Sequence, residues 1–164
     1  MCFTQIMFPT SWLPQLGTLL PRDASRYAGA MVAWWGAVVC LVVVTGRSLV
    51  HLLSRDGGAT SIATIDTDVA GGSNIIALFG QWGASQLLLA VLLWVLLLRY
   101  RGLTSLVLLV FFVEPILRSL SGHLKPLETV GTAPGAALNW LAVPVTGVLL
   151  WLSLCPGRRE RRSG

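Results

Sequence analysis

The chain has 164 residues, of which 54% are apolar and only 12% are charged, and its mean hydropathy is +0.73. Water-soluble domains carry about 25% charged residues, so this composition excludes an ordinary soluble domain. The charged residues comprise 12 Lys and Arg and 7 Asp and Glu, which gives a net charge of +5. We therefore predict an all-α integral membrane protein, folded as a four-helix bundle.

The first 27 residues precede the first apolar block. Pro9, Pro14 and Pro21 prevent this segment from forming one continuous helix. The segment also lacks the cationic region followed by an apolar stretch that is typical of a secretory signal. We interpret residues 1–27 as a loosely ordered or interfacial tail, and we expect the first apolar block to be retained.

Four apolar blocks follow, and crossing a hydrocarbon core takes about 20 residues. The third block contains Glu114, Pro115 and Arg118, but we still expect it to insert. Its strongly apolar residues each contribute roughly −0.3 to −0.6 kcal/mol, whereas a central acid costs about 2.5–3.5 kcal/mol. The predicted spans are about 28–53, 74–98, 103–120 and 136–155, and together they form one bundle over residues 28–155.

The distribution of Lys and Arg predicts the orientation of the bundle. If both termini are cytoplasmic, the inside holds Arg22, Arg26, Arg99, Arg101, Arg158, Arg159, Arg161 and Arg162. The outside then holds only Arg47, Arg55, Arg118 and Lys125. The positive-inside rule favours this topology, N-in and C-in, as a multi-pass protein of the cytoplasmic (inner) membrane.

Residues 156–164 form a basic tail, which we place on the cytoplasmic side of the lipid bilayer. Its cationic cluster follows an apolar span directly and is suited to anionic headgroups. A nucleic-acid-binding arm would need more phosphate contacts and interleaved aromatic side chains, which this tail lacks. We therefore expect no nucleic-acid partner.

The sequence offers no cofactor or metal motif. Cys2, Cys40 and Cys155 form no C-x-x-C pair and have no His at ligand spacing, which argues against zinc and redox sites. Asp66 and Asp68 match the first positions of a calcium-binding loop, but the later ligands are missing. We expect no metal and no cofactor.

Depth along the predicted spans, counted at about 1.5 Å per residue, brings several polar and proline residues to similar levels in the outer half of the membrane. They are Glu114, Pro115, Gln81 and Pro144, with Arg47, Arg118 and Asn139 just above them. An intramembrane carboxylate faces the bundle interior or a wet cavity. We therefore predict a small polar cavity that opens outward between spans 2, 3 and 4, with Arg47 at its rim.

Two roles for this polar group remain open. Glu114 and Arg118 are spaced i,i+4 and can pair on one face of the third span. With Gln81 they could form an interhelical clamp that only holds the bundle together. Alternatively, Glu114 binds a ligand or exchanges protons, while Arg118 sets its pKa and Arg47 attracts an anionic head group.

Small residues recur at helical spacing in the first two spans and permit close helix contact. They are Gly29, Ala33, Gly36 and Ala37 in the first span and Ala77, Gly80 and Ala84 in the second. These stripes favour packing within the chain. Contact with a second copy, as a homodimer, or with another membrane protein is the alternative.

Three segments carry a resemblance to known proteins: FGQWGASQLLL in span 2, VEPILRSLSGHLKP at the end of span 3 and GTAPGAALNW at the start of span 4. With four spans, the chain resembles small bacterial four-helix membrane families of the DoxX-like or unknown-function type, over residues 28–155. The resemblance implies a bacterial cytoplasmic membrane protein. No cofactor motif of a DoxX-like oxidoreductase is visible.

The sequence thus favours a binding or accessory membrane protein over an enzyme. Its cavity candidates are Glu114, Arg118, Gln81, Arg47 and Asn139. A lipid or another amphipathic small molecule is the expected ligand. The alternative is a small transporter or membrane enzyme that uses Glu114 in proton exchange.

Overall fold

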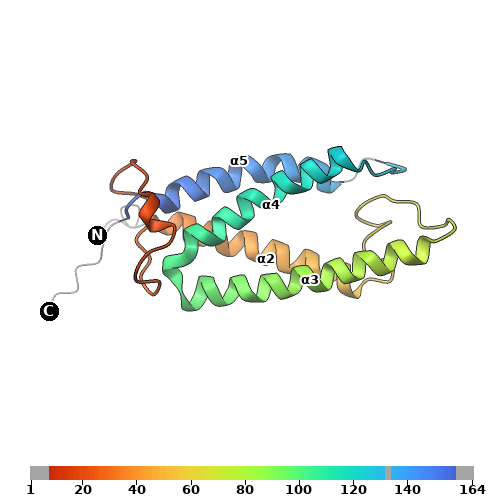
Figure 1. The fold of residues 1–164 in the computed structure, drawn as a ribbon, viewed down its shortest axis with the longest axis horizontal. Helices are drawn as coiled ribbons and strands as arrows, with labels where there is room; N and C mark the ends of the chain where they lie inside the picture. Colours follow the sequence, from red (N-terminus) through yellow and green to blue (C-terminus); the bar gives the residue numbers. More distant parts are fainter. Residues whose placement is uncertain (1–7, 132–133, 158–164) are drawn as a thin grey trace.

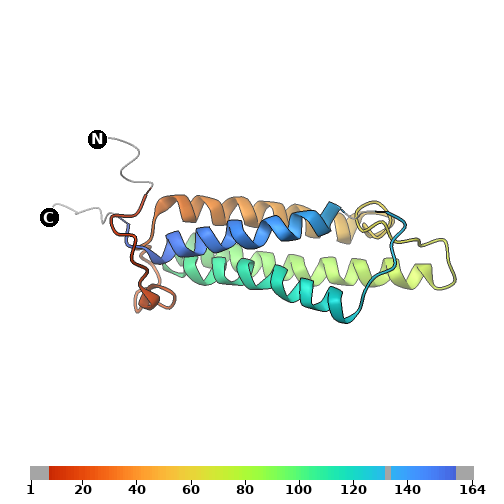
Figure 2. The ribbon, with the colours of Figure 1, turned by 90° about the horizontal axis from the view of Figure 1, so that it is seen from above.

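The fold is a bundle of four long helices, seen in a computed structural model that describes residues 8–131 and 134–157. The helices are α2 (Met31–Leu53), α3 (Gly72–Arg99), α4 (Thr104–Leu124) and α5 (Pro134–Leu154), with short 3-10 helices η1 (Leu16–Thr18) and η2 (Arg101–Leu103). The described residues contain no β-strand. All four helices run along the long axis of the molecule (Figure 1 and Figure 2). The predicted all-α bundle is confirmed.

Three of these segments are long and apolar enough to cross a membrane: Met31–Leu53, Gly72–Arg99 and Arg101–Leu124. The apolar stretch Leu138–Leu154 of α5 is shorter. The third helix continues to Leu124, beyond the predicted end near residue 120. Pro115 lies inside α4 and Pro144 inside α5, so neither proline ends its helix.

The turn after α2, which begins the connection to α3, contains residues in the left-handed region of backbone conformation. Gly57 and Gly58 have φ angles of +60° and +75°, which glycine adopts without steric cost. The Asp56 carboxylate accepts hydrogen bonds from the backbone N–H groups of Gly58, at 3.0 Å, and Ser61, at 2.8 Å. The buried His51 ring lies beneath this turn, with Nδ1 2.7 Å from the Gly57 carbonyl oxygen.

The bundle has two ends that differ in packing. The terminal end carries residues 8–30, the α3–α4 turn and residues 155–157, and the loop end carries residues 54–71 and 125–131. The buried apolar core lies toward the terminal end and consists of Ala33, Trp34, Ala37, Leu41, Ala90, Leu93, Leu97, Val107, Leu108 and Phe111. From there the α2–α3 pair and the α4–α5 pair diverge toward the loop end (Figure 1).

Glycines bring α2, and the residues just before it, close to α5 near the terminal end. A Cβ atom built on Gly36 would lie 2.5 Å from Leu149 Cδ2, and one built on Gly29 would lie 2.3 Å from the Ser153 carbonyl oxygen. The predicted stripe of small residues in the first span therefore packs within the chain. In α3 the stripe is confirmed only at Gly80, whose built Cβ would lie 3.9 Å from the His51 carbonyl oxygen; Ala77 and Ala84 are exposed, and Gly83 makes the closer contact with His51.

The described part of the N-terminal segment, which the sequence indicated to be a loosely ordered or interfacial tail, packs against the ends of the helices. Its backbone crosses the terminal end and bonds to the end of α5: Thr10 N–H donates to Pro156 O at 2.8 Å and Gln15 N–H to Leu154 O at 2.9 Å. Gly102 N–H, between α3 and α4, donates to Ala24 O at 2.8 Å. Residues 1–7 and residues 158–164 of the predicted basic tail lie outside the described residues.

The α2–α5 contact predicts how glycine substitutions in α2 act. Gly36→Leu forces a side chain into Leu149, and overpacking of this kind costs about 1–3 kcal/mol of unfolding free energy. Gly46→Leu is the matched control, because nothing lies within 4 Å of a Cβ built there. We expect denaturant unfolding in detergent micelles to show destabilisation by Gly36→Leu only. Equal stability of the two variants would contradict the close approach of α2 and α5.

The turn around Asp56 predicts a pH effect at the loop end. Hydrogen bonds from Ser61 and Gly58 hold the pKa of Asp56 well below its usual value. These bonds therefore stabilise the turn above the unfolded-state pKa of about 3.9, and the contribution is lost as pH falls through the lower folded-state value. We expect hydrogen exchange at the Gly58 and Ser61 amides, corrected for intrinsic rates, to accelerate in acid. Asp56→Ala should remove the protection at every pH, whereas Asp66→Asn should leave it unchanged.

Candidate functional site

A cavity of about 560 Å³ lies between α2, α4 and α5 toward the loop end. Most of its lining is aliphatic, including Val39 and Val43 of α2 and Leu138, Leu141 and Val145 of α5. These five side chains are also exposed on the outside of the bundle. The cavity is therefore a groove whose mouth faces sideways, between α2 and α5. Ile62, from the loop after α2, also lines it.

This position corrects the predicted one. The sequence placed the cavity between spans 2, 3 and 4, but its walls come from the first, third and fourth helices of the bundle. The reason is the packing of α3, which lies tightly against α2 through Gly83 and His51. The exposed walls of α2 and α5 place a mouth on the side of the bundle.

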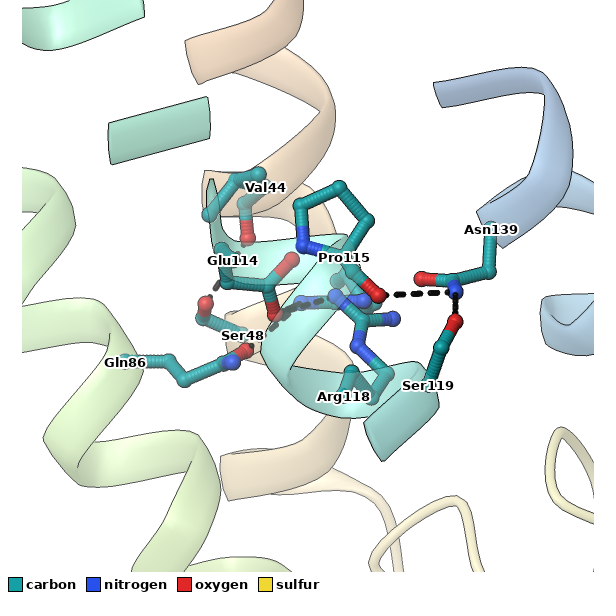
Figure 3. Close-up of polar contacts among 9 residues, drawn as sticks. Val44, Ser48, Gln86, Glu114, Pro115, Arg118, Ser119 and Asn139 are labelled. Atoms are coloured by element: carbon teal, nitrogen blue, oxygen red, sulfur yellow. Dashed lines mark hydrogen bonds and ion pairs between the residues drawn. The ribbon is translucent and has the colours of Figure 1, made fainter. Parts of the chain in front are cut away.

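The charged groups of the groove come from α2 and α4. Arg118 Nη2 donates to Glu114 Oε1 (Figure 3). Arg47 Nη2 lies 3.8 Å from the same oxygen. The three side chains retain between 24% and 36% of their accessible surface, so the cluster is partly open to the groove. The i,i+4 pairing of Glu114 with Arg118 agrees with the spacing seen in the sequence.

Arg47 also ties α2 to α3. Its Nη2 atom donates to Gln86 Oε1 at 2.9 Å, and its guanidinium carbon lies 5.5 Å from the centre of the Trp82 ring. Gln86 thus takes the place that the sequence assigned to Gln81, whose side chain is exposed and does not line the groove. The two glutamines are five residues apart and point to different sides of α3. Depth along the helix did not reveal which side faces α2.

Asn139 connects α5 to α4 at the groove. Its Nδ2 group donates to the Pro115 carbonyl oxygen at 3.0 Å and to Ser119 Oγ at 2.7 Å (Figure 3). The side chain is 9% exposed and lines the groove. Asn139 was a predicted site residue, whereas Ser119 was missed because a lone serine in a helix carries no distinct signal.

The groove is unbalanced in charge and in hydrogen bonding. Two guanidinium groups face one carboxylate, which leaves one excess positive charge. Among the described residues, four buried polar side-chain atoms have no hydrogen-bond partner, and three of them belong to residues that line the groove: Arg47 Nε, Arg118 Nε and Asn139 Oδ1. Buried polar groups are normally paired, so these atoms indicate a place for a polar ligand.

Other titratable side chains do not form a second centre in the part of the chain that the structure describes. No group of three or more His, Cys, Asp or Glu is arranged there to hold a metal ion. His51 is enclosed by Phe79 and Trp82, with ring centres at 5.7 Å and 4.8 Å. Comparison of the chain with protein-family models, with curated proteins and with solved structures found no match.

The charge imbalance predicts the effect of removing the carboxylate. Glu114→Gln leaves Arg47 and Arg118 facing each other with no counter-charge, and loss of one partner of a buried ion pair is destabilising. Because the side chains remain partly exposed, we expect a loss of about 1–3 kcal/mol of unfolding free energy. Denaturant titration measures it, with Glu128→Gln at the exposed loop end as control.

The double variant Glu114→Gln/Arg118→Met separates charge repulsion from loss of packing. Removing one guanidinium relieves the repulsion, so this variant should recover part of the lost stability. A double variant no more stable than Glu114→Gln would show that the carboxylate does not act by balancing charge.

Proposed function

We propose that this protein is a membrane-embedded binding or accessory protein whose α2–α4–α5 groove holds an amphipathic small molecule, such as a lipid. The apolar part of the ligand lies along the aliphatic walls, and its polar part lies against Arg47, Glu114 and Arg118. The groove mouth between α2 and α5 then faces the hydrocarbon of the bilayer, from which such a molecule is supplied.

The observation that supports this proposal is that one cavity combines aliphatic walls with a cluster of charged and polar side chains. Its volume of about 560 Å³ lies within the range of small-molecule sites, about 300–1,000 Å³. Its walls are aliphatic, and its few polar groups converge from α2, α4 and α5. A fully polar ligand would leave the walls uncovered, and a purely apolar one would leave the charges unsatisfied.

We further propose that α5 is a fourth membrane crossing and that both chain ends face the cytoplasm across a bacterial inner membrane. The described ends of the chain lie at the same end of the bundle, which agrees with an even number of crossings (Figure 1). Arg22, Arg26, Arg99 and Arg101 belong to that end, as positive-inside topology requires. This membrane and topology also agree with the resemblance to DoxX-like proteins.

Proton exchange by Glu114, in a small transporter or membrane enzyme, is the second candidate. The partly exposed carboxylate favours it, since a proton could reach Glu114 from the groove. However, protonation of Glu114 would leave Arg47 and Arg118 without a counter-charge unless an anion entered at the same time. We therefore favour ligand binding as the primary role.

Filling the groove tests the proposal. Ala142 lines the groove, and Ala142→Trp places a large side chain in the volume assigned to the ligand. Native mass spectrometry after purification in a mild nonionic detergent should detect retained amphiphile on the wild-type protein. We expect about tenfold less on Ala142→Trp, equivalent to about 1.4 kcal/mol of binding free energy.

Leu92→Trp is the control, because Leu92 is 54% exposed on α3 and does not line the groove. This variant should retain as much amphiphile as the wild-type protein. The proposal fails if the wild-type protein retains none, or if Ala142→Trp retains the same amount as the wild-type protein.

A further inference from the structure

We infer that the ligand of the groove is an acidic amphiphile whose head group combines one anionic group, a carboxylate or a phosphate, with a neighbouring hydroxyl or N–H donor. This inference rests on the proposed function and specifies the head group that the same groove selects. It follows from the charges of the residues that line the groove and from the unpaired polar atoms that these residues carry.

The excess charge identifies the sign of the head group. Arg47 and Arg118 carry two positive charges, and Glu114 supplies one negative charge. A monoanionic head group makes the groove neutral, whereas a cationic one would add a third positive charge in a region of low dielectric constant. A neutral head group would leave the excess charge in place. Only an anion removes it.

The unpaired atoms identify the hydrogen-bonding pattern. Arg47 Nε and Arg118 Nε are donors, and a carboxylate or phosphate accepts from guanidinium groups in strong, charge-assisted hydrogen bonds. Asn139 Oδ1 is an acceptor only, so it requires a donor from the ligand. A simple carboxylate or phosphodiester has no such donor. The complementary head group therefore carries a hydroxyl or N–H group as well.

The position of Asn139 sets how close the two parts of the head group must be. Its amide is anchored to the carbonyl oxygen of Pro115, the residue that follows Glu114 in α4 (Figure 3). This bond holds the amide of Asn139, in α5, beside the residue that follows Glu114 of the charge cluster. A donor on the carbon next to the anionic group, or within a short polar extension of it, fits this arrangement.

A set of amphiphiles with one chain length tests the head group. Wild-type protein in phosphatidylcholine nanodiscs is titrated with α-hydroxydodecanoate, dodecanoate, dodecyl maltoside or dodecyltrimethylammonium, and apparent affinities are taken from the rise in thermal unfolding midpoint. We expect α-hydroxydodecanoate to bind about fivefold more tightly than dodecanoate, as one neutral hydrogen bond allows. Dodecanoate should in turn bind at least about tenfold more tightly than the neutral or cationic amphiphile.

Two variants locate the effect in the groove. Arg47→Met removes one guanidinium and should abolish the preference of the protein for anions over dodecyl maltoside. Arg47→Lys keeps the charge and should preserve that preference. The comparison of α-hydroxydodecanoate with dodecanoate needs no variant, so it remains informative even if Arg47→Met fails to fold.

Three other outcomes would each contradict a different claim: the head group, the binding function, or the amphiphilic nature of the ligand. If the anionic, neutral and cationic amphiphiles bind equally, the head-group inference is wrong and the proposed function stands. If none of them binds, the proposed function itself fails. Finally, α-hydroxybutyrate has the same head group without the chain. If it binds as tightly as α-hydroxydodecanoate, the site takes a free small anion and the ligand is not an amphiphile.

Discussion

The close approach of α2 to α5 near the terminal end, and its loss toward the loop end, determines the shape of the molecule. Gly29 and Gly36 allow contact where α2 begins, whereas Val39 and Val43, farther along the helix, line an open groove. Helices in a membrane associate through packing rather than through the hydrophobic effect, so small residues decide where they meet. The core therefore forms at one end, and the charged residues of α2 and α4 face a space at the other.

The clamp and ligand-binding interpretations of the polar cluster involve the same atoms. Arg47 joins α2 to Gln86 of α3 and to Glu114 of α4, and Asn139 joins α5 to α4. These contacts hold all four helices together near the groove, as a clamp would. They do not use every polar atom, however, and the excess charge remains. The cluster is therefore suited both to joining the helices and to holding a polar ligand.

Hydropathy and residue spacing predicted the helices and part of the site, because helix formation and contacts within one helix depend on local sequence. The pairing of Glu114 with Arg118 follows from one turn of helix, and depth counting placed Arg47 and Asn139 at the right level. Depth counting does not tell which side of a helix faces its neighbour. For this reason Gln81 was selected from the sequence, whereas Gln86 is the glutamine that contacts Arg47. Gln86 lies in line with the buried residues Gly83, Ala90 and Leu97, a pattern that would have identified it. The packing of residues 8–30 against the helix ends could not be predicted. It depends on backbone hydrogen bonds such as that from Thr10 N–H to the Pro156 carbonyl oxygen, between residues 146 positions apart.

The backbone bonds of the N-terminal segment have a mechanical consequence. They join both the end of α5 and the α3–α4 turn to residues 8–30, so this one segment connects the two helix pairs at the terminal end. The loop end is joined as well, because Val130 N–H donates to the Thr64 carbonyl oxygen at 2.9 Å and Thr64 Oγ1 donates to the Gly131 carbonyl oxygen at 3.0 Å. Residues 54–71, between α2 and α3, are thereby held against residues 125–131, between α4 and α5. Backbone bonds therefore join the two helix pairs at both ends of the bundle, and the side opening between α2 and α5 lies between these two joined ends.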